Sequence, residues 1–401
     1  MKIGGVDAQQ LAAEFGTPLL AIDLEVLNAS LTTILDACER ARISASYAAK
    51  ALMLKALGQH LKPRRIGIDV CSLGELITVE QAGIEPERVT LHGAGKTDDE
   101  LEAALDGRVG RLVVDNLDEL RRLIVLSHER SLDILLRLNT GIEAHTHEFV
   151  RTAGDSSKFG LAPREVIHAL AMLLEHQNLR LRGVHSHIGS QIYDTAPFVA
   201  NAELLLAALG HARKAGLDAD TIVVGGGFGV QMHPETPEES LDVAATIAAI
   251  GAAIPSSVHC EIEPGRAVIA AAGTSLYRVV AIKRYERRTF IIVDGSMADN
   301  PRPALYGAYH HVTCVHESAS PKHPVTISGR SCENDELATA ALPHDVQVGD
   351  LLAVATTGAY TYSMASNYNR YARPPVVAVG GGQARLWAKR ESPEDLSRND
   401  V

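Results

Sequence analysis

Short apolar runs recur along the first two thirds of the chain, and each one ends in a polar or glycine-rich cluster. Apolar runs of this length, bounded by turn-forming residues, predict β-strands. Three of them, at residues 112–114, 134–136 and 222–224, are continuously apolar, which is typical of strands buried on both faces. In all, the pattern predicts eight strands, at residues 43–50, 66–71, 88–93, 111–115, 132–139, 181–187, 221–225 and 258–263.

The segments between these strands have the periodicity and composition of helices. A regular alternation of strand, polar loop and helix predicts a (β/α)8 TIM barrel, an α/β fold, and residues 26–270 have a normal length for it. Active sites in such barrels lie at the carboxyl ends of the strands, so we expect the chemistry there. The predicted helices lie at residues 97–104, 116–129, 163–176, 197–215 and 238–253.

The pattern changes from Thr274 onward. Short strand-like runs follow one another, separated by glycine, proline and aspartate turns, and this predicts an antiparallel β domain of sandwich or barrel type. The strand-like run at residues 18–23 precedes the barrel, and we expect it to join this domain. The domain would consist of residues 1–25 and 271–401, with further strands at residues 276–282, 290–293, 325–327, 351–355 and 376–379.

Composition limits the classes of function. The net charge of −11, from 38 basic and 49 acidic residues, argues against a general nucleic-acid surface. No apolar run is long enough to span a membrane, and the first residues lack the layout of a signal peptide, so we expect a cytoplasmic protein. The five cysteines have no C-x-x-C spacing and indicate neither a zinc site nor a disulfide framework, so no metal is predicted.

Three predicted strand ends carry candidate chemistry. Lys50 ends the first strand, and a lysine in a partly dry pocket can form a Schiff base, although a lysine there is more often solvated. Residues 225–227 are glycines, which suit either a phosphate nest or an ordinary tight turn. Strand eight ends in Glu263, Pro264, Gly265 and Arg266, and barrel loops after strands seven and eight frequently bind phosphate.

Together these features indicate pyridoxal 5'-phosphate as the cofactor. Glu263 is the candidate for the carboxylate that keeps the pyridine nitrogen protonated, so that the ring can accept electrons. His187, at the end of strand six, could stack on the ring, although an imidazole there is as often a satisfied core group. Asp69 and Arg137, at the ends of strands two and five, are predicted to form a supporting ion pair.

Motifs spread over nearly the whole chain carry a resemblance to a known family. They lie at residues 47–50, 69–76, 187–192, 225–229 and 263–266, and further ones at 143–149, 157–160, 302–308, 358–360 and 364–369. With these motifs the chain resembles the fold type III pyridoxal-phosphate decarboxylases, and among them the diaminopimelate decarboxylase family of actinobacterial type.

The resemblance implies a role for each matching residue. Lys50 would carry the cofactor as a Schiff base, His187 would stack on its ring, and Glu263 would contact its pyridine nitrogen. Cys332 would donate a proton to the substrate α-carbon, although a cysteine is more commonly a small buried hydrophobe. The implied cofactor site, with the serine, the glycines and Arg266 at the phosphate, comprises Lys50, Asp69, His187, Ser190, Gly225, Gly226, Gly227, Glu263, Gly265, Arg266 and Tyr360.

The implied reaction converts meso-2,6-diaminopimelate to L-lysine and carbon dioxide, the last step of lysine biosynthesis. Arg302 can pair with the distal carboxylate of this substrate and Glu333 can accept from its distal ammonium; without a site, both would lie on a solvated loop. In the family the Cys332 segment reaches the partner's active site, which implies a homodimer with shared sites. The implied substrate-binding residues are Arg266, Arg302, Tyr306, Glu333 and Tyr360.

Three alternatives remain open. A related decarboxylase acting on another diamino acid or a specialised biosynthetic substrate would keep the cofactor site, and residues 333–335 depart from the serine and glycine usual in the family. Alanine racemases share the domain plan but support the pyridine nitrogen with an arginine, which Glu263 argues against. A catalytically silent binding protein would not need Lys50, Glu263 and Cys332 together.

Overall fold

The computed structural model describes two compact units within the chain. One unit consists of Met1–Leu31, Val230–Glu239 and Val268–Val401, and the other of Thr32–Gly229 and Ser240–Ala267. The described residues are 1–128, 130–142, 157–234, 236 and 240–401, so the family-like motif at residues 143–149 lies outside them.

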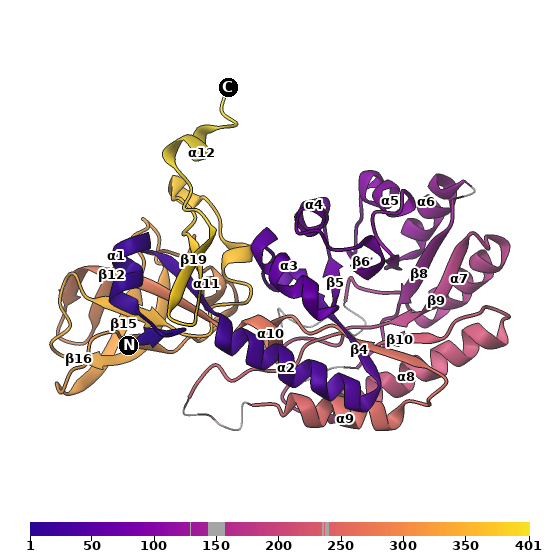
Figure 1. Ribbon diagram of the computed structural model, residues 1–401, viewed down its shortest axis with the longest axis horizontal. Coiled ribbons are helices and arrows are strands. Elements are labelled where there is room, and N and C mark those ends of the chain that lie inside the picture. The colour runs from indigo at the N-terminus through magenta and orange to yellow at the C-terminus, as the bar shows by residue number, and fades with distance from the viewer. Residues whose placement is uncertain (129, 143–156, 235, 237–239) are drawn as a thin grey trace. The chain divides into compact units, whose positions relative to one another are not determined.

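The eight predicted barrel strands are present in the second unit and close into a barrel of parallel strands. Each strand pairs with its neighbours along the chain, and the last pairs with the first. Figure 1 shows this progression in colour from indigo to orange. The strands are β4 (Ile43–Ala48), β5 (Gly67–Val70), β6 (Val89–Leu91), β7 (Arg111–Val114), β8 (Leu132–Arg137), β9 (Leu179–His185), β10 (Thr221–Val223) and β11 (His259–Ile262).

Helices connect these strands where the sequence predicts them. Several begin at a recognisable cap; Thr97 and Glu100, for example, form a capping box at the start of α5. The last predicted helix begins at Val243 because the Asp242 side chain accepts a hydrogen bond from the Ala245 N–H. The confirmed helices are α5 (Asp98–Leu105), α6 (Leu117–Ser127), α7 (Pro163–Glu175), α8 (Ala196–Lys214) and α9 (Val243–Ala253).

Three further helices accompany the barrel strands, and the sequence pattern did not locate their bounds. They are α2 (Leu24–Ala41), which leads into β4, α3 (Lys55–Leu61) and α4 (Leu73–Gln81). In α4 only Leu76 and Val79 are buried, and a short helix with so few core positions gives a weak periodic signal. Ser72 caps α4 by accepting from the Glu75 N–H, which is the signal that marks this helix start.

The first unit contains the predicted β domain, and its main sheet is mixed rather than antiparallel. The strand order is β16-β15-β13-β12-β3-β18-β19, in which β13 with β15 and β3 with β18 are parallel pairs. The prediction of a purely antiparallel domain is therefore wrong. Apolar alternation identifies a strand but not its direction, and the long connections between these partners permit a crossover.

The strand before the barrel joins this sheet, as predicted. It is β3 (Leu19–Asp23), which pairs with β12 and β18 and is almost fully buried. The remaining strands are β12 (Gly273–Arg284), β13 (Thr289–Val293), β14 (Val312–Cys314), β15 (Lys322–Ser328), β16 (Glu336–Pro343), β17 (Leu351–Val354), β18 (Val376–Gly380) and β19 (Gln383–Ala388).

Short elements complete the unit. The β1 (Lys2–Ile3) and β2 (Val6–Asp7) hairpin and α1 (Ala8–Phe15) bury Ile3, Val6 and Leu11 in a core with β3, β12 and β18. A second core lies between β12, β13 and β15–β17. The short helices α10 (Arg266–Ile269), α11 (Arg302–Tyr306) and α12 (Pro393–Ser397) are also described. Among the described residues, the helices are too short or too polar to cross a lipid bilayer.

Candidate active site

Lys50 lies immediately after β4, at the carboxyl end of the barrel. It occupies a 3-10 turn, η1 (Ala49–Ala51), between two buried alanines, while its own side chain is exposed. Burial is the main cause of the lowered pKa values of His92 and His187, and the charge of Lys50 contributes to both. Lys50 therefore lies close to the ends of β6 and β9, where the sequence placed the chemistry.

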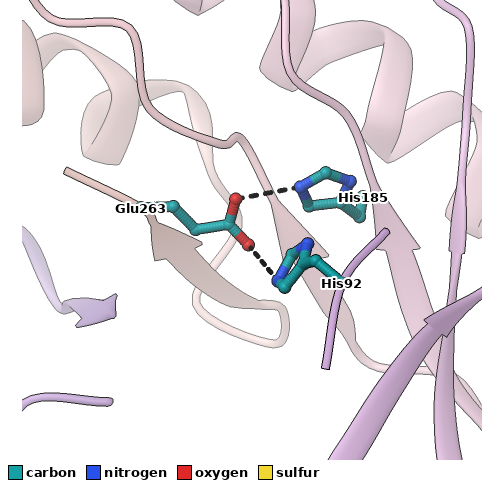
Figure 2. Close-up of side chains that lie close together, drawn as sticks. All are labelled: His92, His185 and Glu263. Carbon is teal, nitrogen blue, oxygen red and sulfur yellow. Dashed lines mark hydrogen bonds and ion pairs between the residues drawn. The ribbon is translucent and has the colours of Figure 1, made fainter. Parts of the chain in front are cut away.

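Glu263, just beyond β11, lies between two buried imidazoles. One carboxylate oxygen is 2.9 Å from His185 Nε2 and the other is 3.3 Å from His92 Nε2. Figure 2 shows the two rings, from the ends of β9 and β6, converging on the carboxylate. The rings also contact each other edge to face, with centroids 5.2 Å apart. This arrangement fixes the position of Glu263 at the strand ends.

The Glu263 carboxylate is held in its ionised form. Burial alone would raise its pKa, but the neighbouring imidazoles, above all His185 with its 2.9 Å hydrogen bond, outweigh burial and hold the pKa well below its ordinary value. Burial in turn lowers the pKa values of His92 and His187, so these imidazoles are neutral at physiological pH. The site thus presents a buried negative charge beside the neutral rings of His92 and His187.

Asp69, at the end of β5, has a different environment from the one predicted. It accepts a 2.6 Å hydrogen bond from Ser46 Oγ and lies 3.5 Å from His92 Nε2. Burial, together with the nearby Glu263 and Glu261, raises its pKa well above its ordinary value. The predicted ion pair with Arg137 is wrong: Arg137 pairs with Asp115 at 3.3 Å. A buried carboxyl beside two other carboxylates is more stable when neutral.

The glycine run after β10 forms a turn that admits no side chains. A Cβ on Gly226 would lie 2.1 Å from the Glu263 carbonyl oxygen, and one on Gly227 would lie 2.2 Å from that of Gly189. Gly227 also has a φ of +105°, which glycine adopts readily. The Gly226 N–H donates to His187 Nδ1 at 3.2 Å, which orients that imidazole. The backbone of this turn thus packs directly against the backbone of Glu263 and Gly189, which only glycine permits.

Ser190 and Arg266 come together beside this turn. An Arg266 guanidinium N–H donates to Ser190 Oγ at 3.3 Å, and Arg266 is buried. Gly265 precedes it, and a Cβ there would lie 3.2 Å from those of both Ala48 and Ala51. The glycine therefore allows the end of β11 to approach the turn that carries Lys50. A guanidinium, a hydroxyl and a glycine turn form an anion-binding set of donors.

The predicted substrate residues of the β unit form a cluster around Arg302. Arg302 is only 6% exposed, and its guanidinium lies over the rings of Tyr306 and Tyr360, at 5.4 and 5.6 Å from their centroids. Tyr360 has a φ of 59°, a left-handed conformation that costs roughly 1–3 kcal/mol for such a residue. The surrounding structure therefore holds Tyr360 in place against this cost.

Cys332 and Glu333 lie in the connection between β15 and β16. Both side chains are exposed, and Glu333 accepts a 2.5 Å hydrogen bond from the Tyr368 hydroxyl. Asp335 is buried and orders this turn, because its carbonyl accepts from the Gly329 N–H at 2.9 Å. Residues 333–335, which differ from the serine and glycine usual in the family, thus lie in a turn that is held by hydrogen bonds.

Comparison with known proteins assigns this architecture to a family. The family model described as "Pyridoxal-dependent decarboxylase, pyridoxal binding domain" matches residues 25–270, which contain the whole barrel. The chain belongs to the pyridoxal-dependent decarboxylases. Members of this family are pyridoxal-phosphate-dependent carboxy-lyases, so the predicted fold, cofactor and class of enzyme are confirmed.

Full-length relatives narrow the comparison within the pyridoxal-dependent decarboxylases. Diaminopimelate decarboxylase from Actinosynnema pretiosum subsp. auranticum is 41% identical over all of this chain and 92% of that protein. The enzyme of the same name from Bacillus subtilis is 39% identical, over all of this chain and 95% of that protein. A crystal structure of diaminopimelate decarboxylase from Helicobacter pylori, complexed with L-lysine, superposes with a TM-score of 0.91 at 29% identity and 98% coverage of both chains.

The barrel residues of this decarboxylase fit pyridoxal 5'-phosphate. The ionised, buried Glu263 matches a protonated pyridine nitrogen, and the neutral His187 presents an uncharged ring. The glycine turn and the Ser190–Arg266 pair supply the donors that a phosphate requires. Lys50 lies between Ala48 and Ala51, and both of these alanines face Gly265, the residue before Arg266.

Sequence reasoning missed residues that this decarboxylase places beside the predicted ones. His92 and His185 hold Glu263, and Tyr368 holds Glu333. Each histidine ends a predicted strand, so its position was a usable signal. No spacing in the chain, however, indicates that β6, β9 and β11 bring these three side chains together.

Proposed function

We propose that this protein converts meso-2,6-diaminopimelate to L-lysine and carbon dioxide with pyridoxal 5'-phosphate bound at the barrel strand ends. The observation that carries the proposal is the buried Arg302 between two tyrosine rings, in a chain whose full-length relatives bear the name diaminopimelate decarboxylase. A guanidinium can bind a carboxylate through two parallel hydrogen bonds, and this substrate has a carboxylate at its distal end. Lysine and ornithine have no such group.

In the barrel, each predicted residue has a distinct task. Lys50 would anchor the cofactor covalently through its amine and exchange with the amino group of the substrate. Ser190, Arg266 and the glycines 225–227 would hold the phosphate, and Glu263 would hold a proton on the pyridine nitrogen. When bound, the cofactor supplies an electron sink for the pair released as carbon dioxide leaves.

His187 and the two imidazoles around Glu263 would orient this assembly. A neutral His187, held by the Gly226 N–H, can lie flat against the cofactor ring without repelling its positive charge. His92 and His185 would keep the Glu263 carboxylate pointed at the ring nitrogen. Asp69 would support His92, whose Nε2 lies 3.5 Å from its carboxyl oxygen.

In the β unit, the Arg302 cluster and the Cys332 turn would complete the reaction. Arg302 would pair with the distal carboxylate, while Tyr306 and Tyr360 pack against the guanidinium and restrict its orientation. Glu333, positioned by Tyr368, would accept from the distal ammonium. Cys332 would then donate the proton from its Sγ to the substrate α-carbon, which yields L-lysine.

The proposal is tested by measuring carbon dioxide release from four substrates in parallel. Cofactor-loaded protein is supplied with meso-diaminopimelate, L-lysine, L-ornithine or D-ornithine. We expect release from meso-diaminopimelate only, with L-lysine formed in equal amount. Preference for another substrate would overturn the roles of Arg302 and Glu333, and no release from any of the four would favour a specialised substrate or a silent relative.

Replacing Glu263 with glutamine tests its role at the pyridine nitrogen. Glu263→Gln removes the buried negative charge but keeps the shape of the side chain, so cofactor should still bind while turnover falls roughly 10²–10³-fold, the range associated with one preorganised electrostatic contact. Steady-state rates and the cofactor spectrum are the measurements. Glu261→Gln, two residues earlier on β11 and paired with Arg111, is the matched control and should change turnover only a few-fold. Equal losses in both variants would contradict the role.

We further propose that the enzyme is a homodimer in which Cys332 completes the site of the partner subunit. The exposed position of Cys332 and Glu333 supports this, because a proton donor must be shielded from water and neither side chain is shielded within its own chain. Symmetric dimers are the commonest assemblies that build sites from two chains.

Mixing two inactive variants tests the shared site. Lys50→Ala and Cys332→Ala chains, unfolded and refolded together, should regain about one quarter of wild-type activity, because half of the random dimers would each contain one intact site. Each variant refolded alone is the control and should stay inactive. Failure of the mixture to regain activity, with dimers confirmed by light scattering, would place both residues in the same chain's site.

We also propose a cytoplasmic location. The five cysteines all lie in described parts of the chain and all are free thiols, which is the usual state in a reducing compartment. Fractionation of cells that express the natural protein tests this, and recovery with the membrane or extracellular fraction would contradict it.

A further inference from the structure

A cysteine, a histidine and an aspartate converge at one edge of the β unit. Cys314 is the last residue of β14, which pairs antiparallel with β17 so that Cys314 faces Leu352. His316 lies two residues further on, and continuing the same register places it opposite Asp350, the residue just before β17. The Val315 N–H donates to the Leu351 carbonyl at 2.9 Å, which keeps the two segments paired here. The backbone thus places all three residues at the same edge.

The ligand atoms of these residues are close together. Cys314 Sγ lies 3.0 Å from His316 Nδ1, which lies 3.7 Å from Asp350 Oδ2, and all three atoms are within 4.8 Å of one another. Tetrahedral ligands of zinc, with bonds of about 2.0–2.3 Å, are roughly 3.4–3.6 Å apart. The observed separations of 3.0 and 3.7 Å lie just below and just above this range. Small side-chain rotations would therefore allow all three atoms to bind one ion.

We propose that Cys314, His316 and Asp350 bind a zinc ion. Thiolate, imidazole and carboxylate are all ligands that zinc takes, and three protein ligands leave a fourth position for water. Cys314 and His316 line a groove of about 970 Å³ in this unit, so an ion and its water can enter from solvent. All three residues belong to the β unit and none is among the predicted site residues, so the proposal does not depend on the proposed reaction.

The local charges favour a cation at this position. The carboxylates of Asp350 and Asp345 both act electrostatically on the Cys314 thiol. These carboxylates create a negative potential that attracts a divalent ion, and Asp345 is held nearby by Ser318 Oγ at 2.8 Å. Asp350 Oδ2 also accepts from the Gln347 N–H at 2.8 Å, which orients it as a supporting hydrogen bond orients a metal ligand.

Zinc at this position would close a long segment of the chain. Cys314 and Asp350 bracket residues 315–349, which include β15, β16 and the turn that carries Cys332. Cross-linking the two ends of a long segment reduces the freedom of the unfolded chain and stabilises the folded one. The ion would therefore act as a structural clamp at the base of these strands.

Cobalt and zinc binding to the untagged, cofactor-loaded protein tests the proposal. After treatment with a chelator, the protein is titrated with Co²⁺, and a thiolate-to-cobalt charge-transfer band is sought in the difference spectrum. We expect the band to saturate at about one ion per chain and Zn²⁺ to displace the cobalt. The thiolate band distinguishes this site from the His92, His185 and Glu263 cluster, which contains no sulfur.

Three variants locate the ion. Cys314→Ser should abolish the band, and His316→Ala should weaken binding at least tenfold, because even supporting residues change metal affinity 10–100-fold. His316 is 32% exposed, so its alanine variant is expected to fold even if the cysteine variant does not. Cys332→Ser, at an exposed cysteine of the same unit, is the matched control and should keep the band. Absence of the band from the natural protein, its survival in Cys314→Ser, an unchanged cobalt affinity in His316→Ala, or loss of the band in Cys332→Ser would each overturn the proposal.

Discussion

Lys50→Ala is expected to lower turnover of meso-diaminopimelate to below about one thousandth of the wild-type rate, because no other group can replace a covalent amine at this strand end. The characteristic absorbance of lysine-linked cofactor should disappear at the same time. Absorption spectra and steady-state rates are the measurements. Lys50 is exposed in a short turn, so the substitution should leave the barrel folded.

The control for this result is another lysine in the same region. Lys55 begins α3, five residues further on, and is also exposed. Lys55→Ala should keep both the cofactor absorbance and the turnover. A Lys50→Ala protein that retained linked cofactor and full activity would rule out Lys50 as the anchor, and equal losses in both variants would indicate a structural effect.

Arg302→Met is expected to reduce kcat/KM for meso-diaminopimelate roughly 10²–10³-fold, since truncating one partner of a buried charge pair costs about 2–5 kcal/mol. The loss should appear with little change in the cofactor spectrum, because Arg302 belongs to the β unit and not to the predicted cofactor site. Arg302→Lys should retain part of the activity, because it keeps the charge but not the bidentate geometry. Kinetics with each purified variant measure both effects.

Arg288→Met is the matched control for Arg302→Met. Arg288 also lies over an aromatic ring of the β unit, 4.6 Å from the Phe290 centroid, but it is exposed. Its loss should leave kcat/KM within about twofold of wild type, as expected for a surface arginine. A small effect of Arg302→Met, comparable to the control, would remove Arg302 from substrate binding.

The barrel strands were predictable because they are buried on both faces and end in polar clusters. Residues 112–114 and 222–224 show this pattern, and the structure has β7 and β10 there. The helices α3 and α4 were missed because they have few buried positions, as Leu76 and Val79 show. The β unit was identified as a sheet, but its two parallel pairs were not, since alternation contains no information on strand direction.

The candidate site was predictable to the extent that each residue ends a strand. Lys50, His187 and Glu263 all follow this rule, and a barrel brings the ends of its strands to one face. The hydrogen-bond and ion-pair partners of these residues were harder to predict from the sequence. The expected pair between Asp69 and Arg137 is absent because Asp115, just beyond the neighbouring strand β7, pairs with Arg137 instead.

The sequence by itself therefore determined the alternation of elements, the family, the cofactor and the residue types available at each strand end. These depend on local patterns and motif order, which the chain expresses directly. Only the tertiary structure decided that His92 and His185 hold Glu263 ionised, that burial and nearby carboxylates raise the pKa of Asp69, and that Cys314, His316 and Asp350 converge. These properties depend on burial and on distances between residues far apart in the chain, and strand register and packing fix both.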